Sequence, residues 1–159
     1  MDAGGGDGSD ILERLRRPVT PELYERVRQL WIRHSVAEDE RDLEGLISTL
    51  TPDCVYEVVP TGQRWEGHEG ARAFYTTFLG AFPDVKFHLT DIAIGPQGVI
   101  EVADLTGTHR GTWAGIRATG LPVRLQVVIS FPWHPEAELF TGERVWFDRG
   151  ALTEQVATA

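Results

Sequence analysis

Apolar residues in the first half of the chain recur with the 3.6-residue period of an α-helix. Thr20-Pro21-Glu22 is typical of a helix start, because it combines a hydroxyl cap, Pro at the first helical position and an acid in the first turn. The apolar face that follows is formed by Leu23, Val27, Leu30, Trp31 and His34. We predict a second helix from about Asp42 to Thr51-Pro52, and a third from about His68 to Phe82.

The second half of the chain alternates between apolar and polar positions, which is the pattern of half-buried strands. We predict strands over 54–59, 85–94, 99–109, 123–133 and 139–147, and a last helical turn after Asp148. Three helices followed by long strands indicate an α+β fold, with the helices covering one face of a curved antiparallel sheet. Residues 1–19 are expected to be a disordered or loosely ordered tail, and residues 20–159 a single domain.

The same alternation assigns the two faces of each predicted strand. One row in 123–133 consists of Leu125, Val127, Ile129, Phe131 and Trp133. The corresponding rows on its neighbours are Ala103, Leu105, Gly107 and His109, and Leu139, Thr141, Glu143, Val145 and Phe147. If the more apolar row points inward on every element, three polar side chains are left inside the fold: His34, His109 and Glu143.

Composition excludes several classes of function. The net charge of −9 argues against nucleic acid and against docking on an anionic membrane, because both need clustered Lys and Arg. The one cysteine, Cys54, cannot form an intrachain disulfide, and no HxH or HExxH spacing suggests a metal site. No apolar run is long enough for a membrane span, and no secretory signal stands at the N-terminus, so we expect a cytoplasmic protein.

Several segments, in this order and spacing, resemble the SnoaL-like polyketide cyclases. They are 42–46 (DLEGL), 52–56 (PDCVY), 67–70 (GHEG), 82–84 (FPD), 107–111 (GTHRG), 118–123 (ATGLPV) and the closing 146–148 (WFD) with Leu152 and Gln155. The resemblance covers about residues 21–156. It implies a cone-shaped barrel of the nuclear transport factor 2-like, cystatin-like type, with a deep apolar cavity for a small hydrophobic molecule. It also implies a homodimer and a reaction without a cofactor.

The catalytic acids of the related enzymes fall on aliphatic residues here. By spacing, the acid and the histidine of the SnoaL-like cyclases fall on Val145 and Ile129. The proton-accepting Asp of ketosteroid isomerase falls on Val58, its oxyanion-donating Asp on Ile129 and its first-helix Tyr on His34.

Glu143 is therefore the strongest candidate for an acid or base, since it precedes Val145 by two residues on the same strand face. His34 and His109 are candidates to position or polarise a carbonyl group, although a core histidine and a loop-shaping histidine explain them as well. We expect the pocket to be lined by Trp31, Tyr56, Val58, Trp65, Phe74, Phe78, Leu105, Trp113, Val127, Ile129, Val145 and Phe147.

Two hypotheses remain open. The chain is either a cyclase or isomerase of a hydrophobic carbonyl compound, or a non-catalytic homodimeric binding or structural domain with an apolar cavity.

Overall fold

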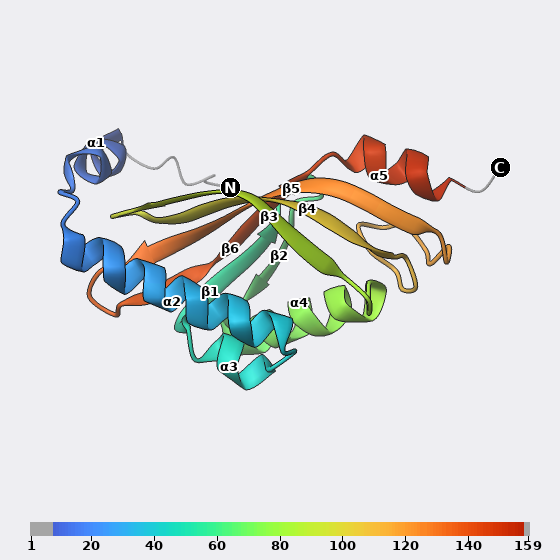
Figure 1. The fold of residues 1–159 in the computed structure, drawn as a ribbon, viewed down its shortest axis with the longest axis horizontal. Coiled ribbons are helices and arrows are strands. Elements are labelled where there is room, and N and C mark those ends of the chain that lie inside the picture. Colours follow the sequence, from blue (N-terminus) through green and yellow to red (C-terminus); the bar gives the residue numbers. More distant parts are fainter. Residues whose placement is uncertain (1–7, 158–159) are drawn as a thin grey trace, which may run out of the picture.

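Six strands form one curved sheet in the order β2-β1-β6-β5-β4-β3, in a computed structural model that describes residues 8–157 (Figure 1). The strands are β1 (Leu50–Val58), β2 (Gln63–Glu66), β3 (Lys86–Gly95), β4 (Gly98–Thr108), β5 (Pro122–His134) and β6 (Leu139–Phe147). The four long predicted strands and the α+β class are confirmed, and β1 begins four residues before its predicted start. The short strand β2, which follows the turn at Gly62, was not predicted.

The sheet is mixed rather than wholly antiparallel, and in this respect the prediction was wrong. β1 and β6 run parallel, with Tyr56 opposite Glu143 and Val58 opposite Val145, whereas the other neighbouring pairs are antiparallel. A parallel pair requires a long connection between its strands. Here that connection is everything from β2 to β5, so no local pattern could reveal it.

Helices α2 (Pro21–Asp39), α3 (Leu43–Ile47) and α4 (Gly67–Ala81) cover the concave face of the sheet (Figure 1). The predicted cap of α2 is confirmed, because the Thr20 hydroxyl accepts a hydrogen bond from the Leu23 amide. Asp42 caps α3 in the same way through the Gly45 amide. All three predicted helices are present and begin within one residue of the expected positions, and α3 ends about four residues earlier than expected.

The terminal helices lie outside this layer (Figure 1). α5 (Arg149–Val156) is capped by Asp148 and is tied to β5 by Gln155, whose side chain bonds both backbone groups of Arg124. α1 (Gly8–Arg16) lies at the opposite end of the molecule. Of the tail predicted over 1–19, residues 1–7 lie outside the described residues, and 8–16 are helical. In the described part of the chain, no helix has the length and hydropathy needed to cross a membrane.

Alternation along β4 and β5 places the predicted rows inside the fold. All five residues of the β5 row are buried, and so are Ala103, Leu105 and His109. On β6 the row is interrupted by a bulge. Phe140 is fully buried while its neighbours Leu139 and Thr141 are only partly buried, so the two were wrongly assigned to the inner face.

The bulge depends on Gly142. Its φ of 120° is a conformation that residues with a side chain rarely adopt, and a Cβ at this position would collide with the Val55 carbonyl oxygen. The extra residue shifts the alternation of the strand by one position. After the bulge, Glu143, Val145 and Phe147 therefore face inward. Glu143 is only 3% exposed as a result.

Candidate functional site

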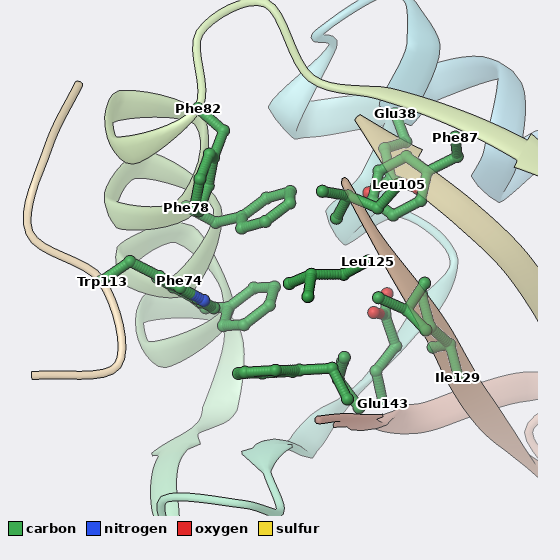
Figure 2. Close-up of a pocket in the computed structure, with 13 residues that line it drawn as sticks. Glu38, Phe74, Phe78, Phe82, Phe87, Leu105, Trp113, Leu125, Ile129 and Glu143 are labelled. Atoms are coloured by element: carbon green, nitrogen blue, oxygen red, sulfur yellow. The ribbon is translucent and has the colours of Figure 1, made fainter. Parts of the chain in front are cut away.

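A narrow apolar cavity lies between α4 and the inner face of the sheet (Figure 2). It is lined by Glu38, Phe74, Phe78, Phe82, Phe87, Leu105, Trp113, Leu125, Val127, Ile129, Glu143, Val145 and Phe147. The volume of the cavity is only about 30 Å³. The cavity is therefore a slot, and a larger ligand enters it only if side chains on the wall change rotamer.

The two long walls of the slot differ in chemistry. On one side lie aromatic rings from α4 together with Trp113 from the loop over 109–121 (Figure 2). The rings of Phe74 and Phe78 are stacked, with an interplanar angle of 8° and centroids 6.0 Å apart, and Trp113 meets Phe78 edge-on at 5.2 Å. The opposite wall is mainly aliphatic and comes from β4, β5 and β6, with Phe147 of β6 and Phe87 of β3 at its margins. Such walls suit a flat hydrophobic molecule.

Glu143 brings a carboxylate to this apolar slot, and its orientation is fixed by three side chains. His34 Nε2 lies 2.8 Å from Oε1, the Tyr75 hydroxyl 2.6 Å and the Tyr56 hydroxyl 2.9 Å. Within residues 8–157, every hydrogen bond to this carboxylate reaches Oε1. The second oxygen, Oε2, is thus the one left for a molecule in the cavity.

Thr49 fixes the tautomer of His34. The Thr49 hydroxyl donates its hydrogen to the Leu46 carbonyl at 2.6 Å, so it must accept from His34 Nδ1, also at 2.6 Å. His34 Nε2 and Glu143 Oε1 then share one further proton. The Tyr56 and Tyr75 hydroxyls donate to the same oxygen, so three side chains meet at Oε1.

The tyrosines keep their protons in this site. Burial raises the pKa of Tyr56 and Tyr75 well above the usual range, and the neighbouring Glu143 charge raises the pKa further. Both hydroxyls therefore remain donors throughout the pH range in which the protein would work.

A second carboxyl group, Glu38, also lines the cavity and was not predicted from the sequence. It stands one helical turn after His34 and so continues the apolar face of α2. Burial, followed by the nearby charges of Glu143 and Glu101, raises the pKa of Glu38 well above its ordinary value. A continued 3.6-residue period was the signal that could have found it.

Glu101 is a third buried acid, and it too was missed. It lies on the inner face of β4, two residues before Ala103, where the Trp31 indole donates to its Oε2 at 2.9 Å. Burial raises the pKa of Glu101 to about 7. The predicted row over 103–109, extended by one step toward the N-terminus, would have found it.

His109 lies apart from Glu143, at the base of the loop that carries Trp113. Its ring stacks on Phe82 at 5.5 Å, its Nδ1 lies 3.2 Å from the Thr119 hydroxyl, and it is not among the residues that line the cavity. Its carbonyl oxygen accepts from the Thr119 and Gly120 amides, and its own amide donates to Leu121. These contacts close the loop.

The structure places eight of the twelve predicted pocket residues on the cavity wall. The other four lie behind it. Tyr56 reaches Glu143, Val58 pairs with Val145, Trp65 packs against Phe74 at 5.3 Å, and Trp31 bonds Glu101. Ile129 and Val145, the positions on which the sequence resemblance places catalytic groups, line the cavity.

The described residues offer no obvious site for a metal ion or a phosphate-bearing cofactor. Within 8–157, no three His, Cys, Asp or Glu side chains converge in a geometry suited to a metal. None of the cavity-lining residues in this range is Lys, Arg or His, so nothing on the wall would neutralise a phosphate.

Comparison with known proteins agrees with this geometry. The family described as SnoaL-like polyketide cyclase matches residues 22–156. No curated protein shows significant sequence similarity to the chain.

Many solved structures share the fold. A protein from Jannaschia sp. CCS1 assigned to the SnoaL-like polyketide cyclases is 21% identical, with a TM-score of 0.74 over 90% of this chain and 99% of that one. An NTF2-like protein of unknown function from Burkholderia pseudomallei K96243 is 14% identical, with a TM-score of 0.69 over 84% and 98%. TerC, co-crystallised with polyporic acid, is 17% identical, with a TM-score of 0.66 over 84% and 99%. At these identities the likeness shows the fold alone.

Proposed function

Since this chain belongs to the family of SnoaL-like polyketide cyclases, we propose that it is a cofactor-independent enzyme that moves a proton on a neutral, hydrophobic carbonyl compound, with Glu143 as the acid–base group. The observation that carries the proposal is the asymmetry of the Glu143 carboxylate. Three donors hold Oε1, and Oε2 has no partner among the described residues, at the wall of an apolar cavity.

Fixed orientation is what a general base needs. A carboxylate whose rotamer is locked by His34, Tyr56 and Tyr75 loses no side-chain entropy when a substrate arrives. The apolar walls keep water scarce, so a charge that develops on the substrate interacts more strongly with the carboxylate than it would in solution. His34 and the two tyrosines act through Glu143 and are positioning residues.

The position of Glu143 also allows it to replace the acid that the sequence resemblance places at Val145. Val145 and Ile129, on which the resemblance places the acid and the histidine, stand on the cavity wall. Glu143 lies two residues before Val145 on the same face of β6, about 7 Å along the strand. A carboxylate there reaches the same cavity from a neighbouring position.

Proton exchange tests the proposal without knowledge of the natural substrate. A base that removes a proton from the carbon next to a carbonyl, exchanges it with D₂O and then returns a deuteron labels the ketone with deuterium. We expect the protein to accelerate deuterium incorporation into 2-tetralone or another small bicyclic ketone, followed by ¹H NMR. Glu143→Gln is expected to lower the exchange rate by about 10² or more while ketone binding is retained.

Glu57→Gln is the matched control, because Glu57 is a carboxylate on the adjacent strand β1 that pairs with Arg144 at 2.9 Å. It should exchange at the rate of the unaltered protein. Equal rates in the Glu143→Gln variant and the unaltered protein would contradict the proposal. Ketone binding without exchange across a panel of neutral ketones would favour the non-catalytic binding domain instead.

A further inference from the structure

Glu38 is placed so that its carboxyl group shares the cavity with Glu143. Glu38 extends from the last turn of α2. It lies on the same side of the slot as Glu143, which extends from β6 (Figure 2). The two carboxyl groups thus reach one apolar space from opposite layers of the fold. Glu38 is only partly buried, and it lies toward the part of the cavity that Phe87 and Leu105 line.

The surroundings of Glu38 favour its neutral form. Among the described residues its carboxyl group makes no hydrogen bond, and the nearest charges from the packed elements are Glu143 on β6, Glu101 on β4 and Asp39 on α2. Arg41 is the opposing cation, and its guanidinium donates to backbone carbonyls of Glu38 and Val85 rather than to the carboxylate. His34, one turn earlier, is already bound to Glu143 and Thr49.

A neutral carboxyl group can do what Glu143 cannot, because it offers an O–H donor. We propose that Glu38 binds the oxygen of a neutral ketone by donating this hydrogen bond, so that the α-carbon of the same ketone faces Glu143 Oε2. This inference rests on the proposed function and adds the group that recognises the substrate. It makes Glu38 and Glu143 a donor and an acceptor with separate roles.

The reaction then balances within the cavity. Glu143 Oε2 takes the proton from the α-carbon, the C–H electron pair becomes the carbon–carbon double bond of the enolate, and the carbonyl π pair moves to the oxygen. The Glu38 O–H stabilises the charge on that oxygen. When the proton on Glu143 exchanges with a solvent deuteron before it is returned to carbon, one hydrogen of the ketone is exchanged. Attack of the enolate carbon on a second carbonyl of the same molecule would instead close a ring, and the proton held by Glu143 would then pass to the new alkoxide oxygen.

The same two carboxyl groups select ligands by charge. No cationic side chain belongs to the described lining of the cavity, and an anionic ligand would be repelled by Glu143 and would force Glu38 to stay protonated. The substrate class is therefore a flat, uncharged ketone rather than a carboxylate or a phosphate.

Calorimetric titration with 2-tetralone at pH 6 and pH 9 tests the role of Glu38. In the unaltered protein, affinity should fall as the pH rises, because ionisation of Glu38 removes the donor and adds a negative charge. Glu38→Gln should bind equally at both pH values, since the amide N–H donates at either. Glu38→Ala should bind about tenfold more weakly at pH 6, which corresponds to one lost hydrogen bond. The anion 2-naphthoate should bind at least tenfold more weakly than the ketone.

Glu136→Gln, at an exposed turn position, is the control and should keep the pH dependence of the unaltered protein. The inference is overturned if Glu38→Gln loses affinity with pH as the unaltered protein does, if Glu38→Ala binds normally, or if 2-tetralone does not bind. Its failure is distinguishable from that of the proposed function. Glu143→Gln should still bind 2-tetralone and lose only the deuterium exchange.

Discussion

Replacement of the buried acid Glu101 by Gln should flatten the pH dependence of stability. Glu101 is 7% exposed, and burial raises the pKa of its carboxyl group from about 4.5 to about 7. Below pH 4.5 the group is protonated in both folded and unfolded chains and has no effect. Between pH 4.5 and 7 the unfolded chain ionises first, so the folded state loses stability as the pH rises, and above pH 7 the loss is complete.

The size of this loss follows from the shift in pKa. A rise in pKa from about 4.5 to about 7, at roughly 1.4 kcal/mol for each pH unit, gives an upper limit of about 3.5 kcal/mol. Gln is neutral at every pH, and its amide oxygen can still accept the Trp31 indole hydrogen, which bonds Glu101 Oε2 at 2.9 Å. Relative to the unaltered protein, Glu101→Gln should therefore gain about 2–3 kcal/mol between pH 5 and pH 8.

Urea unfolding at both pH values, followed by tryptophan fluorescence, measures this difference directly. Glu136→Gln, at an exposed turn position, is the matched control and should change with pH as the unaltered protein does. If the stability of Glu101→Gln and that of the unaltered protein fall in parallel between pH 5 and pH 8, Glu101 is ionised in the folded state at pH 5 and the reasoning fails.

Two further substitutions test the parts of the fold that fix Glu143. Tyr75→Phe removes the hydroxyl that donates to Oε1 at 2.6 Å, and should cost about 2 kcal/mol of stability in urea unfolding, whereas an unchanged midpoint would mean that the bond contributes nothing. Gly142→Ala should lower the melting temperature through at least about 2 kcal/mol of strain, because its φ is 120° and its Cβ would meet the Val55 carbonyl. Gly80→Ala, in an open helical position of α4, should instead increase the free energy of unfolding by about 0.5–1 kcal/mol and so raise the melting temperature. A similar loss of stability in both variants would refute the role given to the bulge.

Much of the fold could be predicted because it rests on local periodicity. The inner rows of β4 and β5 follow a period of two without interruption, so Leu125 and Val127 were placed correctly from the sequence alone. Glu143 was placed inside correctly because it shares a period-two row with Val145 and Phe147, after the bulge. The row on β6 failed at Thr141, because the bulge at Gly142 depends on a positive φ that no alternation encodes.

Sequence reasoning placed His34 inside the fold with Glu143, but it could not show which side chains contact the carboxylate. Tyr75 and Tyr56 lie 68 and 87 residues from it along the chain, and they meet it through helix packing and the parallel pairing of β1 with β6. Glu38 was missed for a different reason. A charged residue is usually taken as the end of the apolar face of a helix. Glu38 instead continues that face one turn beyond His34, and its side chain lines the cavity.

Both proposals require a ligand to bind in the cavity beside the free oxygen of Glu143. A crystal structure of the protein grown with 2-tetralone tests this most directly. We expect the ketone between the Phe74–Phe78 wall and Leu125, with its α-carbon next to Glu143 Oε2 and its oxygen at Glu38. A ketone bound elsewhere on the molecule, with these aromatic side chains unmoved and the slot still closed, would contradict it.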